Sequence, residues 1–236
     1  MKKIFSVLLL AIAAVTVAHA DEAAVKKAAQ GFIGDRGQVD SVRKSVVPGL
    51  YEVQVGSDLF YVDEKGQHAF FGDIVDLKTR TNLTDERRTK LSAIKFSDLP
   101  LSMAIKQVRG NGKRVMATFE DPNCGYCKKL HKDAQTLTDV TIYTFLFPIL
   151  GPDSLEKSKN ILCSADPAKA WSDWMENGVV PPLVKNCGVD LDKYVALGQK
   201  FNVRGTPNIF MVDGSRIPGA VPLAQIEASL NATTKK

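Results

Sequence analysis

The 236-residue sequence has few of the residues that build metal centres and disulfide scaffolds, with four cysteines and three histidines. A chain of this length does not need disulfides as a folding scaffold, so each cysteine needs its own explanation. Beyond the N-terminal segment, no apolar run approaches the ~20 residues that a membrane-spanning helix requires. The net charge is only +5, and the basic residues form no stripe of the kind that nucleic-acid binding needs.

The first twenty residues have the pattern of a secretory signal sequence. Lys2 and Lys3 precede a mostly apolar run over residues 4–17, and the small residues Ala18 and Ala20 mark a cleavage site. A membrane anchor is the rival interpretation, but about 14 apolar residues fall short of a bilayer span. We therefore expect residues 1–20 to be a signal peptide that directs the chain to an oxidising compartment. Its removal leaves 29 basic and 26 acidic residues, a net charge of +3.

Residues 21–80 have the pattern of a small α+β module. Apolar residues at helical spacing up to Phe32 predict one helix, and the alternating residues that follow predict an antiparallel sheet with turns at 48–49 and 63–66. A core of this size is marginal alone. Two interpretations are open: the module pairs with a second copy through a sheet edge, or it docks onto the next domain.

The remaining chain divides into a linker and a larger domain. Over residues 81–100, a charged stretch without glycine or proline (82–94) predicts a solvated linker helix. Over residues 101–236, strand and helix patterns alternate, with strands expected at 115–119, 141–147 and 208–212. A helix from Cys124 to about residue 138, with Asn123 as a plausible N-cap, follows the first strand. Residues 153–200 are expected to be helical and irregular.

Cys124 and Cys127 are spaced for reversible disulfide chemistry at the start of that helix. Two cysteines three residues apart across a helix start lie ~5 Å apart at Cα, which a disulfide can bridge. The helix N-terminus should lower the pKa of Cys124 and make it the nucleophile. Cys127, one turn inside, should act as the resolving thiol. Lys128 and Lys129 either add positive charge here or are simply solvated.

A structural zinc site is the alternative use of these cysteines. It would need a closed set of four ligands. Cys163 and Cys187 are 24 residues apart, and the sequence has no second CxxC motif. We therefore expect no metal and no cofactor.

A second motif precedes the strand at residues 208–212. Thr206-Pro207 places a proline directly before an internal strand, which in combination with the CxxC motif predicts a cis peptide bond. Together, residues 119–131 (FEDPNCGYCKKLH) and 203–207 (VRGTP) resemble the DsbC/DsbG family of periplasmic protein disulfide isomerases. The CGYC sequence is closer to the DsbC branch, and the similarity extends over the whole mature chain.

The resemblance implies an architecture. Residues 101–236 would form a thioredoxin-like catalytic domain with a helical insertion, and residues 21–80 a cystatin-like α+β dimerisation domain. The product would be a V-shaped periplasmic homodimer whose two CGYC sites face an apolar cleft. Cys163 and Cys187 match the second, structural disulfide of the family, and closing that loop would contribute ~3.5 kcal/mol.

The resemblance also implies a mechanism. Cys124 would attack wrongly paired disulfides of misfolded periplasmic proteins, with Cys127 completing the dithiol. Thr206 and cis-Pro207 would face the CGYC segment and hold the substrate chain, with Gly125 and Tyr126 beside it. A membrane thiol reductant of the DsbD type would keep the site reduced, and chaperone activity could accompany catalysis.

One feature departs from the wider thioredoxin-fold pattern. Many members bury a carboxylate on the strand that leads to the CxxC motif, and residues 115–119 contain none. We expect Glu120 and Asp121 to be loop residues, so the acceptor of the Cys127 proton is open. His131 is ~10 Å along the helix from Cys124, too far for direct general-base work, and is expected at the surface.

Two other functions remain open at this stage. A monomeric dithiol oxidase would have a similar catalytic domain but no obvious use for residues 21–80. A holdase chaperone would bind unfolded chains without using its cysteines. Loss of activity on changing Cys124 to serine separates the enzyme from the holdase, and the oligomeric state separates the isomerase from the oxidase.

Overall fold

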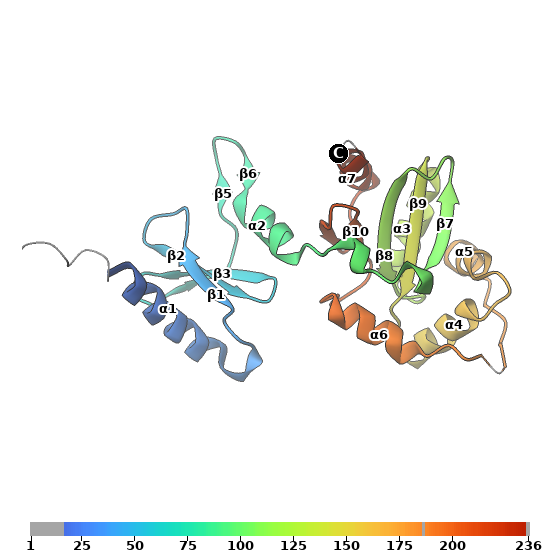
Figure 1. Cartoon of the computed structure of the whole chain (residues 1–236), viewed down its shortest axis with the longest axis horizontal. Helices are drawn as coiled ribbons and strands as arrows, with labels where there is room; N and C mark the ends of the chain where they lie inside the picture. Colours follow the sequence, from blue (N-terminus) through green and yellow to red (C-terminus); the bar gives the residue numbers. More distant parts are fainter. Residues whose placement is uncertain (1–16, 186, 235–236) are drawn as a thin grey trace, which may run out of the picture. The chain divides into compact units, whose positions relative to one another are not determined.

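The computed structural model describes residues 17–185 and 187–234, and the chain divides into two compact units. The first unit extends to Leu91 and the second begins at Ser92; both are drawn in Figure 1. Of the expected signal peptide, residues 1–16 lie outside the described part. In the two described ranges, no helix combines the length and apolar character needed to cross a bilayer.

In the first unit, a helix packs on a four-stranded antiparallel sheet. The helix is α1 (Val17–Ile33), and the strands in spatial order are β1 (Ser41–Lys44), β2 (Leu50–Val55), β3 (Asp58–Asp63) and β4 (Ala69–Phe70). A tight turn joins β2 to β3, and Gly56 in it has a φ of 62°, a left-handed conformation that favours glycine. The core forms where Val25 and Ala29 of α1 meet Val53 and Phe60 of the sheet.

The charged helix after this sheet is docked and only partly solvated. A short ladder of β5 (Val75–Asp76) and β6 (Thr81–Asn82) leads into α2 (Leu83–Ser92). Thr84 is fully buried and shares a hydrogen bond with the hydroxyl of Tyr61 on β3. Arg87 lies 3.1 Å from the carboxylate of Glu52 on β2. Helix α2 is therefore fixed to the sheet of its own unit.

The second unit is built on a five-stranded sheet with strand order β11-β10-β8-β9-β7. The strands are β7 (Ile105–Arg109), β8 (Arg114–Glu120), β9 (Val140–Leu146), β10 (Asn208–Met211) and β11 (Arg216–Pro218). Only the pair β8 and β9 is parallel among these described strands, and α3 (Gly125–Asp133) makes the crossover between them. The other helices are α4 (Pro152–Leu162), α5 (Pro167–Asn177), α6 (Leu191–Lys200) and α7 (Leu223–Thr234).

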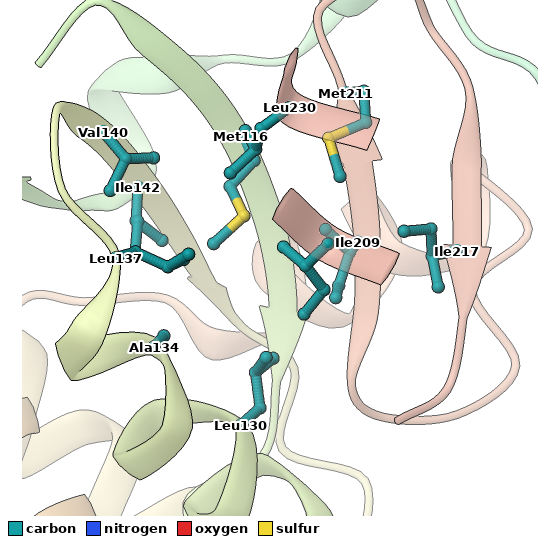
Figure 2. Packing of buried hydrophobic residues seen from close by; sticks show 11 residues of the cluster. Met116, Leu130, Ala134, Leu137, Val140, Ile142, Ile209, Met211, Ile217 and Leu230 are labelled. Atoms are coloured by element: carbon teal, nitrogen blue, oxygen red, sulfur yellow. The ribbon is translucent and has the colours of Figure 1, made fainter. Parts of the chain in front are cut away.

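The two faces of β8 are both buried, against different helices. Met116 lies in an apolar cluster with Leu130 of α3 and Leu230 of α7, as Figure 2 shows. Phe119 belongs to the cluster on the other face, where its ring stacks on that of Phe145 at 4.9 Å between centroids. Since side chains alternate along a strand, Glu120 shares the face of Met116 and points toward the side that α3 covers.

Candidate active site

Cys124 lies at the N-terminus of α3. It is the N-cap residue, in place of the expected Asn123, with an extended backbone (φ −73°, ψ 115°) before the helix begins at Gly125. Its Sγ accepts a hydrogen bond from the backbone N–H of Cys127 at 3.2 Å. Unpaired N–H groups and the helix dipole stabilise negative charge at this position. This position at a helix N-terminus is suited to the sulfur of an attacking cysteine.

Cys127 is the more deeply buried of the two thiols, since Cys124 is 6% exposed. Cys127 is fully buried one turn into α3. Burial raises the pKa of its thiol, and the charge of the nearby Glu120 carboxylate and the contact with Cys124 raise it further. The two thiols thus have the different environments that sequential attack requires, because Cys124 lies at a helix N-terminus and Cys127 is fully buried with a raised pKa.

The Thr206-Pro207 loop lies against the CxxC segment. The bond between the two residues is cis. In the adjacent strand β10, Asn208 pairs with Phe119 of β8, which brings the loop beside the chain that leaves β8. The thiol of Cys124 donates a hydrogen bond to the carbonyl oxygen of Thr206 at 3.3 Å, across 82 positions of sequence. The fold thus brings the two predicted motifs into contact.

The dipeptide between the cysteines is open to solvent. Tyr126 is 68% exposed. Gly125 is also exposed, and a Cβ added there would meet nothing within 4 Å. Both residues are accessible to an incoming chain.

The structure places a buried carboxylate at the end of β8. The expectation that Glu120 is a loop residue is wrong, because it is the last residue of the strand and is 3% exposed. Its Oε1 accepts a hydrogen bond from Thr118 at 2.8 Å, and its Oε2 has no hydrogen-bond partner among the described residues. Burial raises the pKa of Glu120 to about 7. Side chains alternate along a strand, so Glu120 shares a face with Met116 and Thr118. This spacing in the sequence could have predicted its burial.

Asp121, the next residue, lies in the loop as expected but is fully buried. Its carboxylate accepts four hydrogen bonds from protein groups. This burial could not be predicted from the sequence, since three of the four donors to Asp121 come from residues 149–154, in the helical insertion. These four hydrogen bonds hold the loop before Cys124 in place.

His131 is also buried, so its expected surface position is wrong. It is 5% exposed on α3, and its Nε2 lies 2.8 Å from Oε1 of Glu176 on α5. Burial lowers the pKa of the imidazole, although the Glu176 carboxylate opposes that shift. The contact joins α3 to the helical insertion.

Lys128 contacts an aromatic ring. Its Nζ lies 4.0 Å from the centroid of Trp174, and the Nζ of Lys157 lies 4.5 Å from the same ring. The indole Nε1 of Trp174 donates to the carbonyl oxygen of Pro122 at 2.6 Å. The cation–π contacts connect α5 to α3 and α4, and the hydrogen bond connects it to the segment before Cys124.

Cys163 and Cys187 are joined by a disulfide, with their Cα atoms 5.9 Å apart. Cys163 caps the C-terminus of α4, and Cys187 lies in the loop before α6. The bond therefore closes a loop within the helical insertion. Over the described part of the chain, no group of three or more His, Cys, Asp or Glu side chains could hold a metal ion.

Comparisons with known families agree with this architecture. Residues 101–234 match the family of thioredoxin-like domains. Residues 16–85 match the N-terminal domain of disulfide bond isomerase proteins. The predicted fold, a thioredoxin-like domain preceded by a DsbC-type N-terminal domain, is confirmed.

Individual proteins similar to this chain are thiol:disulfide interchange proteins. The probable thiol:disulfide interchange protein DsbC of Bordetella pertussis is 48% identical over 209 residues, covering 89% of this chain and 74% of that protein. DsbC of Escherichia coli K12 is 30% identical over 243 residues, covering 100% of this chain and 98% of that protein. A crystal structure of a disulfide interchange protein from Neisseria gonorrhoeae superposes with a TM-score of 0.54 at 37% identity, covering 58% of this chain and all of that one. The chain belongs to the DsbC family of thiol:disulfide interchange proteins.

Proposed function

We propose that this chain isomerises and reduces non-native disulfides of secreted proteins in the periplasm, with Cys124 attacking and Cys127 resolving. The unequal environment of the two thiols carries the proposal. Cys124 caps a helix N-terminus, and Cys127 is fully buried beside a carboxylate. The apolar, signal-like segment over residues 4–17 supports export.

Isomerisation needs Cys124 alone. Its thiolate attacks one sulfur of a substrate disulfide, a new S–S bond forms, and the other substrate sulfur leaves as a thiolate. That thiolate attacks another disulfide of the same substrate. A substrate thiolate finally attacks the mixed disulfide and releases Cys124 as a thiolate. No electrons are gained or lost overall, so the cycle needs no cofactor.

Reduction releases a stalled substrate. Cys127 loses its proton, attacks Sγ of Cys124, and expels the substrate sulfur as a thiolate. We assign the proton to Glu120, whose pKa of about 7 lets its carboxylate accept one near neutral pH. The resulting Cys124–Cys127 disulfide needs two electrons from a thiol reductant, and a membrane reductant of the DsbD type is the proposed donor.

The cis-proline loop is the proposed binding edge for the substrate chain. The carbonyl oxygen of Thr206 already accepts a hydrogen bond from the Cys124 thiol, so it lies where the reacting sulfur must pass. An extended substrate beside Thr206 and Pro207 would gain backbone hydrogen bonds there. The exposed Gly125 and Tyr126 would form the opposite side of the same site.

The first unit is the proposed dimerisation domain. Strand β4 lies at an edge of its sheet, and Phe70 on it and Phe71 after it are 50% and 67% exposed. A groove of about 420 Å³ beside this edge is lined by apolar residues that include Phe32 and Phe60. Exposed aromatic side chains next to a free strand edge are typical of surfaces that pair.

Two variants test the reaction, with a scrambled disulfide protein as substrate. Cys124→Ser should abolish isomerisation, whereas Cys127→Ser should keep part of it and accumulate mixed disulfides. If Cys124→Ser leaves the main activity intact, the chain is a holdase. A monomer on a sizing column with strong oxidase and no isomerase activity would identify a dithiol oxidase.

A further inference from the structure

We infer that Asp121 is a positioning residue that holds Cys124 in its reactive geometry by fastening the preceding loop to the helical insertion. The inference rests on the proposed role of Cys124 as the nucleophile. It adds a residue that does not touch the substrate and acts through the cysteine. Three sets of contacts support it.

The first set is made by the Asp121 side chain. Its Oδ1 accepts from the backbone N–H of Asn123 at 2.8 Å and from the hydroxyl of Ser154 at 2.7 Å. Its Oδ2 accepts from the backbone N–H groups of Ile149 and Leu150 at 2.8 and 3.0 Å. All four partners act as donors, so only a side chain with two acceptor oxygens satisfies them.

The second set is made by the backbone of the same residue. The carbonyl oxygen of Asp121 accepts from the N–H of Cys124 at 3.0 Å. Side chain and main chain of Asp121 thus fix the N–H groups of two successive residues, Asn123 and Cys124. This turn presents Sγ of Cys124 to the N–H of Cys127, the bond that places the sulfur at the helix N-cap.

The third set shows that the whole loop depends on the insertion. The carbonyl oxygen of Pro122 accepts from Trp174 of α5 at 2.6 Å. The side-chain amide of Asn123 donates to Asp153 at 2.7 Å and to Ser154 at 3.0 Å, both on α4. Each of the three residues before Cys124 is therefore bonded to α4, α5 or the loop ahead of α4. Asp121 makes the largest share of these bonds.

A positioning role for Asp121 and a purely electrostatic effect of its charge predict opposite changes in the reactivity of Cys124 when Asp121 is replaced by asparagine. A buried negative charge close to a thiol disfavours the thiolate, so its removal alone would lower the pKa of Cys124. An asparagine, however, turns an NH₂ donor toward groups that are already donors and loses two of the four bonds. If the loop then relaxes, Sγ leaves the helix N-terminus and the pKa of Cys124 rises.

The test is the pH profile of Cys124 alkylation by iodoacetamide in the reduced, full-length Cys127→Ser protein. Asp121→Asn should move the profile to higher pH and slow alkylation at neutral pH about tenfold, the effect of one pKa unit. Ser154→Ala removes one donor to Asp121 and one acceptor of the Asn123 amide, and should move the profile the same way by less. Leu230→Ala is the control for a general loss of packing, because its buried cluster contains none of residues 121–124.

An unchanged profile, or a shift to lower pH, in Asp121→Asn would overturn the inference, as would an equal shift in Leu230→Ala. If Asp121→Asn does not fold, the alkylation profiles of Ser154→Ala and Leu230→Ala are compared instead. A shift to higher pH in Ser154→Ala alone supports the inference, and no shift or an equal shift in both variants overturns it. Alkylation reports only the state of Cys124. The inference can therefore fail while isomerase activity, and with it the proposed function, stands.

Discussion

Burial and, after it, the nearby carboxylate of Glu120 raise the pKa of the Cys127 thiol, and burial raises the pKa of Glu120 itself to about 7. Both groups therefore retain protons to higher pH than they would in water. With a pKa of about 7, the Glu120 carboxylate is suited to accept the proton that Cys127 must lose before it attacks. Glu120 is therefore the proposed acceptor of the Cys127 proton, which could not be assigned from the sequence.

Glu120→Gln should flatten the pH dependence of stability. The folded pKa of about 7 exceeds the ordinary value of 4.5, so the carboxyl binds its proton more tightly in the folded state. Its stabilising contribution is full below the unfolded pKa and is lost as the pH rises through about 7. Wild type should lose roughly 3 kcal/mol relative to the variant across that window. Urea unfolding at about pH 5 and about pH 8 measures the difference, and parallel behaviour of the two proteins would contradict it.

The same substitution should slow the resolving step. With no carboxylate to take the Cys127 proton, mixed disulfides between Cys124 and a substrate should persist at least about tenfold longer at neutral pH, since a positioned proton acceptor contributes ~10²–10⁴ in rate. Acid-quenched alkylation followed by gel separation measures their lifetime. Thr141→Val is the control, because it changes a buried residue of β9 whose hydroxyl binds the carbonyl oxygen of Gly112 and leaves Glu120 and its hydrogen bond intact. Resolution at the wild-type rate in Glu120→Gln would remove Glu120 from the mechanism.

The double variant Cys163→Ala, Cys187→Ala should lower stability while sparing the chemistry. On the chain-entropy model, closing a loop of this length raises the free energy of unfolding by ~3.5 kcal/mol. The disulfide lies in the helical insertion and includes neither thiol of the CxxC motif. Urea unfolding should show the loss, and the folded variant should isomerise a scrambled substrate at close to the wild-type rate. A folded but inactive variant would mean that this disulfide shapes the active site.

The parts of the site that depend on local sequence could be predicted. Two cysteines three apart after a strand define a helix start, and a proline before a strand defines a turn. The structure has both, with Cys124 at the N-cap of α3 and a cis bond at Pro207. Even here the N-cap falls one residue later than expected, because the side chain of Asn123 is bound to Asp153 and Ser154 while Sγ of Cys124 accepts from the helix.

The burial of polar residues could not be predicted, because it depends on elements distant in sequence. Glu120 is covered by α3 and the sheet, Asp121 by the loop before α4, and His131 by α5. In the sequence Asp121 and His131 have the character of ordinary surface residues. The folded insertion encloses these two, and its contacting residues, among them Ile149 and Glu176, lie about 30 to 45 positions further along the chain.

The most direct measurement of the central claim is site-resolved alkylation of the reduced protein. A brief iodoacetamide pulse near neutral pH, followed by peptide mass mapping, compares the two thiols in one sample. Cys124 should be modified as a thiolate and Cys127 should remain almost unmodified, because the one caps a helix and the other is buried with a raised pKa. Equal labelling of the two cysteines, or faster labelling of Cys127, would contradict the assignment of Cys124 as the attacking thiol.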